Sequence, residues 1–269
     1  MPQRLFNPMA TKAFCSTRGP MPAGPQDPLE HLATLSCYAA GEPIYRQRQP
    51  AIQWHRILSG AARKCVQMPN GSRHIVDFLF PRDLFGFGHA NQHGCSVEAL
   101  TATTQVASYP RETVMALAET DPRIARQIRE TTFDAICRLQ LRLLILGQRT
   151  AIARVCSFIL EMADRTATDP PGLVILPMSR YDIADYLALA VETISRTLTN
   201  LQLGGAIAIR RSRIVHIRDR RILVRLAEEV DGEQSLSSSH AGPLHEASVR
   251  CQLPQAARNN HRPPESDRR

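Results

Sequence analysis

The sequence predicts an α+β protein: a strand-rich N-terminal part, then helices, then a short pair of strands. Three observations support this. Short β-type runs divided by turn signals fill residues 29–110, the pattern becomes helical from Arg111, and a strand pair follows Gly204-Gly205. A chain of 269 residues is long enough for one large domain or two modest ones.

The N-terminal strands alternate with turns in a manner typical of an antiparallel barrel or roll. Pro69-Asn70-Gly71 separates two of them and is a strong hairpin signal. We therefore expect a β-roll over residues 29–118. The β-type runs are Ile52–Leu58, Gly60–Val66, His74–Phe80, Val97–Thr101 and Gln105–Tyr109.

The helical part begins with Arg111–Glu119, and a long second helix follows. Asp121 is a suitable N-cap for that helix, Pro122 fits its first turn, and Gly147 ends it. Its apolar residues recur as in a coiled-coil seam, so we expect residues 119–146 to form a dimerisation helix. The alternative is that this stripe packs only on its own roll. The seam residues are Ile136, Leu139, Leu143 and Leu146.

Composition limits the partners and the location. The formal charge is +8 and the pI is about 9.5, which favours DNA as a polyanionic partner, although such a charge also serves solubility alone. The seven cysteines include no closely spaced pair of metal ligands.

The N-terminus shows no signal peptide and no segment is apolar enough to span a membrane, so we expect a cytoplasmic protein. Residues 1–28 and 231–269 are rich in proline and polar residues and are predicted to be disordered.

Two short helices near residue 190 form the segment most indicative of function. Ser179 and Asp182 give the first helix a capping box, and the second runs from Val191 to about Leu203. Ile194, Leu198 and Leu201 recur at helical spacing and face inward. Two helices joined by so tight a turn present the second to the DNA major groove.

The outward side of the second helix carries suitable base-reading groups. Arg196 can donate two bonds to guanine, Glu192 can accept from cytosine, and Ser195 can touch a base edge. These positions share one helical face. An exposed Glu192–Arg196 ion pair is the alternative reading.

A predicted hairpin follows, with strands Ala206–Ile209 and Arg213–Ile217 and a basic turn between them. It completes a winged helix-turn-helix over residues 147–220. Arg210, Arg211 and Arg213 would add sequence-independent attraction to phosphates, or lie in an ordinary solvated turn.

The run MSRYDIADYLALAVETISRTLTNLQLGGAI strongly resembles the Crp/Fnr family of transcription regulators, and VETISR resembles its Fnr and FixK branch. The resemblance covers about residues 29–225 and implies a cyclic-nucleotide-binding-like β-roll, a dimer helix and a winged helix. It places base reading on Glu192, Ser195 and Arg196, and phosphate contacts on Ser179, Arg180 and Thr193.

The resemblance also implies a biological role. It implies a homodimer on double-stranded DNA with a TTGAT-N4-ATCAA-like palindrome, and activation through contact with RNA polymerase. Regulators of this branch often control genes of microaerobic respiration, nitrogen fixation or denitrification. A repressor remains an alternative.

Departures from the family pattern argue against its two best-known signals. Phe87 follows Gly86 where a glutamate is expected, and Cys95-Ser96-Val97 lacks the arginine that binds a cyclic-nucleotide phosphate. Cys15 is alone in the N-terminal arm and Ala107 occupies the roll cysteine position, so an iron–sulfur cluster is not expected. We expect no cofactor.

A haem- or redox-sensing regulator remains the second reading. His89 and His93, near Cys95, have the spacing of a metal site, although paired loop histidines usually lie on the surface. The chain has no nucleotide-binding glycine loop, HExxH or GxSxG, which argues against an enzyme. The histidines available as ligands are His31, His55, His74, His89 and His93.

The family commonly has glycine where this chain has Ala188, between the two short helices. If this position requires a left-handed backbone, alanine costs about 1 kcal/mol there.

Overall fold

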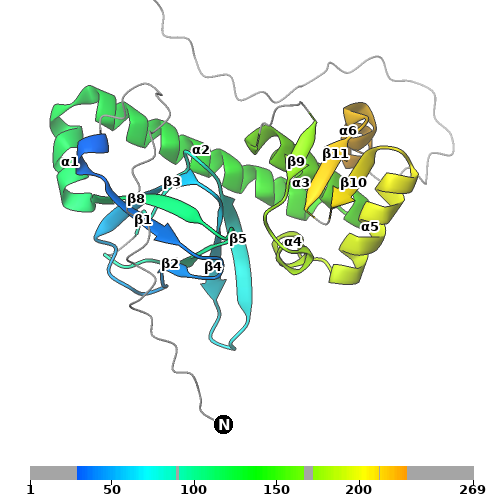
Figure 1. The fold of residues 1–269 in the computed structure, drawn as a ribbon, viewed down its shortest axis with the longest axis horizontal. Coiled ribbons are helices and arrows are strands. Elements are labelled where there is room, and N and C mark those ends of the chain that lie inside the picture. The colour runs from blue at the N-terminus through cyan, green and yellow to red at the C-terminus, as the bar shows by residue number, and fades with distance from the viewer. Residues whose placement is uncertain (1–28, 89–90, 167–171, 212, 229–269) are drawn as a thin grey trace, which may run out of the picture. The chain divides into compact units, whose positions relative to one another are not determined.

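A computed structural model describes residues 29–88, 91–166, 172–211 and 213–228 (Figure 1). The arm and tail predicted to be disordered lie outside these ranges. The roll contains β1 (Thr34–Tyr38), β2 (Pro43–Tyr45), β3 (Gln53–Ser59), β4 (Ala62–Gln67), β5 (Arg73–Leu79), β6 (Leu84–Phe85), β7 (Ser96–Ala99) and β8 (Thr104–Pro110). The other elements are α1 (Arg111–Thr120), α2 (Pro122–Gly147), α3 (Ala151–Arg165), β9 (Leu173–Ile175), α4 (Arg180–Leu187), α5 (Val191–Leu203), β10 (Ile207–Arg211), β11 (Ile214–Ile217) and α6 (Arg220–Glu228), after a short 3-10 turn at Glu30–Leu32.

The predicted antiparallel roll is confirmed. Its strands form two four-stranded sheets in the orders β1-β8-β3-β6 and β2-β7-β4-β5. Gly71 has a φ of 82° in the β4–β5 turn, a left-handed conformation that glycine adopts without strain. Ile57 and Val106 of one sheet pack with Leu79 and Val97 of the other. Strand β5 lies at the edge of its sheet, with β4 as its strand partner.

Two histidines lie inside the roll. His55 and His93 are each only 5% exposed, and the His93 ring stacks on Tyr45 at a centroid distance of 3.7 Å. His55 Nδ1 lies 2.9 Å from the Ser108 hydroxyl. The expectation that His93 lies on the surface is therefore wrong: its ring fills an aromatic core, where stacking replaces contact with water.

The helix boundaries follow the predicted caps. The Asp121 side chain accepts from the backbone N–H of Arg123, with Pro122 in the first turn of α2. Thr150 caps α3 in the same way by accepting from the N–H of Ala153. α2 ends at Gly147, as the sequence predicts.

The C-terminal domain contains two elements that the sequence analysis did not predict. β9 lies where the sequence analysis predicts no strand, and it becomes a strand by pairing antiparallel with β11. α6 packs against α3 and buries Leu223. Its available signals were the N-cap residue Asp219, which accepts from the N–H of Arg221, and the helical spacing of Ile222, Leu223 and Leu226.

Ala188 occupies the left-handed region, with φ 52° and ψ 50°, at the end of α4. Its N–H bonds back to the carbonyls of Ala184 and Asp185 and so closes the helix. This conformation turns the chain sharply into α5, and an alanine Cβ is strained in it.

We predict that Ala188→Gly raises the free energy of unfolding by about 1 kcal/mol, because glycine adopts this conformation without the Cβ penalty. Urea denaturation of both proteins measures the change. Ala163→Gly, within α3, is the control and is expected to destabilise. Equal or lower stability of Ala188→Gly contradicts the strain argument.

We expect the burial of His55 to make stability depend on pH. Burial, with a smaller contribution from His93, lowers the pKa of His55 from 6.5 to about 4, so the folded protein holds a neutral ring. The unfolded chain takes up a proton on His55 below pH 6.5, so the contribution of His55 to stability is fully present above that pH and is lost as the pH falls towards 4. We predict that this one residue lowers the free energy of unfolding by about 2 kcal/mol between pH 7.5 and 5.

Denaturation curves at these two pH values, for wild type and His55→Gln, measure this effect. The variant should lose part of the pH dependence, whatever its stability at pH 7.5. An unchanged difference between the two pH values would show that His55 is protonated within the fold.

Candidate nucleic-acid interface

The first helix of the pair, α4, begins with the predicted capping box. The Ser179 hydroxyl accepts from the N–H of Asp182, and the Asp182 carboxylate accepts from the N–H of Ser179. The Ser179 hydroxyl also donates to Asp182 Oδ2 at 2.7 Å. This reciprocal arrangement satisfies backbone donors that a helix start otherwise leaves unpaired.

The second helix, α5, buries the apolar face that the sequence predicts. Ile194, Leu198 and Leu201 are buried in the core of the C-terminal domain. Ala190, which precedes α5, makes no side-chain cap, so the first backbone N–H groups of the helix have no side-chain partner from it. The helix therefore presents a positive end of its dipole together with its outward side chains.

The predicted base-reading residues are exposed together near the start of α5. Glu192, Ser195 and Arg196 are all solvent-exposed, and they occupy i, i+3 and i+4. Within the described chain, no ion pair joins Glu192 to Arg196, so the alternative reading finds no support in the structure. Both charged groups are available to an incoming ligand.

The predicted phosphate-contacting residues differ in their surroundings. Arg180 is half-buried, and its Nη1 is a buried donor for which the described residues offer no acceptor. Burial accordingly lowers the pKa of this guanidinium. Thr193 is half-buried on α5, and the Ser179 hydroxyl proton is engaged by Asp182. Arg180 is thus the member of this set with an unmet need for an anionic acceptor.

The predicted wing consists of β10 and β11, and β9 extends it to three strands in the order β10-β11-β9. Arg210 and Arg213 are exposed at its tip. Arg211 ends β10, but its side chain lies outside the described part of the structure. The pairing shifts register between Ile209 and Arg211, which twists the strand end locally.

The side of α2 that carries the predicted seam is exposed in the single chain. Ile136 is 44% exposed, Leu139 49% and Leu143 70%, whereas Leu146 is half-buried. Phe133 and Leu144, which the sequence analysis did not single out, are exposed as well. These residues together form a large apolar surface, in contrast to Ile145 of the same helix, which is buried in the chain's own core.

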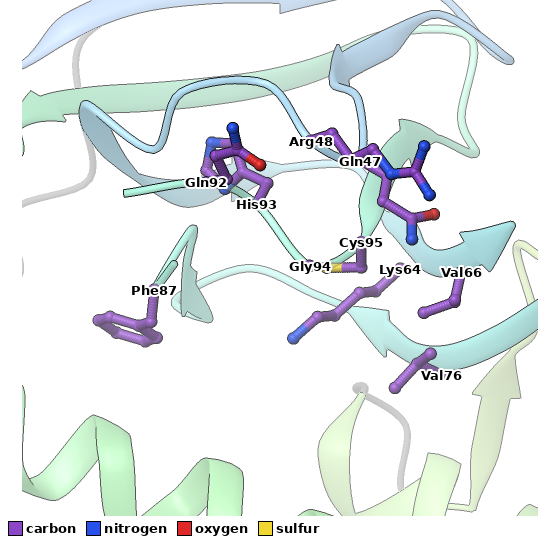
Figure 2. Close-up of a pocket in the computed structure, with 10 residues that line it drawn as sticks. All are labelled: Gln47, Arg48, Lys64, Val66, Val76, Phe87, Gln92, His93, Gly94 and Cys95. Atoms are coloured by element: carbon purple, nitrogen blue, oxygen red, sulfur yellow. The ribbon is translucent and has the colours of Figure 1, made fainter. Parts of the chain in front are cut away.

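The roll contains a cavity of about 500 Å³. Figure 2 shows its lining, with the Lys64 side chain extending towards the side on which Phe87 lies. Val66 and Val76 supply apolar walls, and Arg48 adds a second cation. The sequence analysis missed Lys64, whose place in the cavity depends on strand pairing.

The cavity lacks the groups that the family uses for a cyclic nucleotide. Phe87 replaces the expected glutamate, and Cys95 is buried with its sulfur 4.0 Å from the Tyr45 hydroxyl. The Ser96 hydroxyl accepts from the backbone N–H of Gln47. A phosphate would find no bidentate arginine on β7, so the residues here do not fit that ligand.

Those residues considered for a metal or haem that lie in the described ranges do not form a metal site. The described ranges contain no group of three histidine, cysteine or acidic residues placed to hold a metal ion. His93 and Cys95 belong to the roll core, and His89 and Cys15 lie outside the described residues. Ala107, at the predicted cluster position, is buried on β8 opposite Leu35 and Arg56.

Comparison with known proteins supports this reading of both domains. The Crp-like helix-turn-helix domain matches residues 153–226, and the cyclic nucleotide-binding domain matches residues 35–121. The nitrogen fixation regulation protein FixK of Azorhizobium caulinodans is 37% identical over 207 residues, covering 76% of this chain and 83% of that protein. FixK of Bradyrhizobium diazoefficiens is 33% identical over 201 residues, covering 74% of this chain and 83% of that protein.

The structure of FixK2 from Bradyrhizobium japonicum superposes with a TM-score of 0.68 at 34% identity, covering 74% of this chain and 99% of that one. These relatives are regulators and not enzymes. In the described part of this chain, no helix combines the length and apolarity that crossing a bilayer requires. The chain is a DNA-binding transcription regulator of the Crp/Fnr family, and it is FixK-like.

Proposed function

We propose that this protein binds a TTGAT-N4-ATCAA-like palindrome as a homodimer and activates transcription. The observation that carries the proposal is the exposed, unpaired set Glu192, Ser195 and Arg196 near the start of α5. An arginine there can donate two bonds to the guanine of each half-site, and a glutamate can accept from cytosine N4. Side chains of this chemistry, held on one rigid helix face, discriminate bases by hydrogen bonding.

Phosphate contacts would hold the reading helix in register. We assign them to Ser179, Arg180 and Thr193, and to the wing residues Arg210, Arg211 and Arg213. Arg180 is half-buried and its Nη1 has no acceptor among the described residues, so a phosphate oxygen would supply that acceptor once the side chain turns outwards. Ser179 would contribute by rotating its hydroxyl away from Asp182, because its backbone N–H is engaged by that carboxylate.

The homodimer rests on the exposed seam of α2. Ile136, Leu139 and Leu143 are exposed in the single chain, and a second copy of α2 would bury them along a coiled-coil interface. A two-fold dimer presents two reading helices to the two halves of a palindrome. We take Leu146 as the end of this seam.

The regulatory role follows the relatives. Several are described as nitrogen fixation regulation proteins, and we propose control of nitrogen-fixation, microaerobic or denitrification genes in the cytoplasm through RNA polymerase. In vitro transcription with RNA polymerase from a promoter that carries the palindrome tests activation against repression. Reduced transcript on adding the protein would show a repressor.

We predict that Arg196→Ala and Glu192→Ala each relax discrimination at one base pair of the half-site by about 1–3 kcal/mol, because each removes a base-edge hydrogen bond. Gel shifts with wild-type and singly substituted palindromes measure this. Gln202→Ala, exposed on the last turn of α5, is the matched control and should retain full discrimination. If wild type binds the palindrome no better than random DNA, the proposed function is wrong.

We predict that Leu143→Glu yields a monomer and weakens palindrome binding about 100-fold or more, because a buried charge disrupts the seam and the second half-site contact is lost. Sedimentation measures the mass and a gel shift the affinity. Met115→Glu, at an apolar position 47% exposed on α1, is the control and should remain dimeric. A dimeric Leu143→Glu that binds normally would place the interface elsewhere.

A further inference from the structure

The roll is joined to α4, the first helix of the pair, by an ion pair centred on Asp182. Arg63 of β4 donates to Asp182 Oδ1 at 2.8 Å, and Arg73 of β5 lies 3.4 Å from the same oxygen. The Asp182 side chain is only 4% exposed. We propose that Arg63, assisted by Arg73, is a positioning residue for DNA recognition, which sets the spacing between the two reading helices of the dimer.

The two carboxylate oxygens of Asp182 bind different partners. Oδ2 accepts from Ser179 and caps α4, whereas Oδ1 faces the roll and accepts from Arg63. The charge on Asp182 is therefore balanced by the roll, and the helix start is fixed at the same point. Because the pair is shielded from water, its geometry constrains more strongly than that of a surface ion pair.

A second contact holds the middle of α4. The Asp185 carboxylate accepts from the backbone N–H of Ile75 at 3.1 Å, on the outer edge of β5. His74 lies 3.4 Å from the same carboxylate. Asp182 and Asp185 of α4 therefore both bind the β4–β5 hairpin. Two attachment points restrict rotation of α4 as well as its translation.

The same strand is tied to the proposed dimer helix. Arg142 of α2 donates to the carbonyls of Ile75 and Val76, and to that of Tyr186 on α4. Its guanidinium lies over the Tyr186 ring, 4.5 Å from the centroid. A continuous path therefore runs from α2 through β5 to α4, the helix that packs on α5.

This contact orients the reading surface and does not cover it. Glu192 and Arg196 remain exposed while Arg63 and Asp182 are paired. A dimer reads two half-sites at a set separation, so a helix pair α4–α5 that is fixed firmly to the roll favours one spacer length. A helix pair that is fixed less firmly would also reach half-sites at neighbouring spacings. The inference rests on the proposed palindrome binding and deepens it.

The test compares full-length wild type with Arg63→Gln on three palindromes: the native spacer, and spacers one base pair shorter or longer. A duplex carrying a single half-site reports on the reading helix alone. We expect Arg63→Gln to reduce the preference for the native spacer about threefold to tenfold while half-site binding stays unchanged. Arg46→Gln, an exposed arginine of the roll, is the matched control and should keep the wild-type preference.

An unchanged spacer preference in both Arg63→Gln and Arg73→Gln overturns the inference. Failure of wild type to bind any palindrome overturns the proposed function instead, so the two failures are distinct. Asp182→Asn, whose amide oxygen can still accept in the cap, completes a double-mutant cycle with Arg63→Gln. Spacer preference in the double variant should match that of the single variants, and a loss equal to the product of the two single losses would show that Arg63 does not act through Asp182.

Discussion

The outer edge of β5 is held by arginines from the helices that follow the roll, and the rest of the structure depends on this attachment. Arg165 of α3 donates to the Phe78 carbonyl and pairs with Asp77 and Asp83. Arg142 of α2 covers the carbonyls of Ile75 and Val76. An edge strand exposes unpaired backbone groups, and these side chains supply partners where a further strand would otherwise pair.

The buried charged side chains around Arg165 each have a partner of opposite charge. Glu161, 3% exposed at its side chain, faces Arg165 and the Tyr186 hydroxyl, and burial raises its pKa against the opposing effect of Arg165. Desolvated ion pairs contribute little net stability, but losing one partner leaves an isolated charge. Such a network therefore selects one arrangement of α3 and α4 against the roll more than it strengthens the fold.

Function is separated from this network along α5. The inward residues of α5 complete the core, and its outward charged residues have no partner in the chain's described ranges, so their hydrogen-bonding capacity remains for DNA. The roll keeps the architecture of its family while aromatic packing around Tyr45 and His93 occupies its interior. β7 lacks the arginine that the family uses to hold a cyclic-nucleotide phosphate.

Local signals allowed the sequence by itself to determine much of this protein. The capping box at Ser179, the apolar spacing of α5 and the stop at Gly147 each act within a few residues, so the helix pair and its outward residues were predictable. β9 and α6 escaped prediction because a three-residue strand is defined by its partner and a short helix by its packing. The contacts that orient α4 and α5 were decided only by the tertiary structure. Arg63 and Asp182 are 119 positions apart, and no periodicity in the sequence specifies that their charges meet.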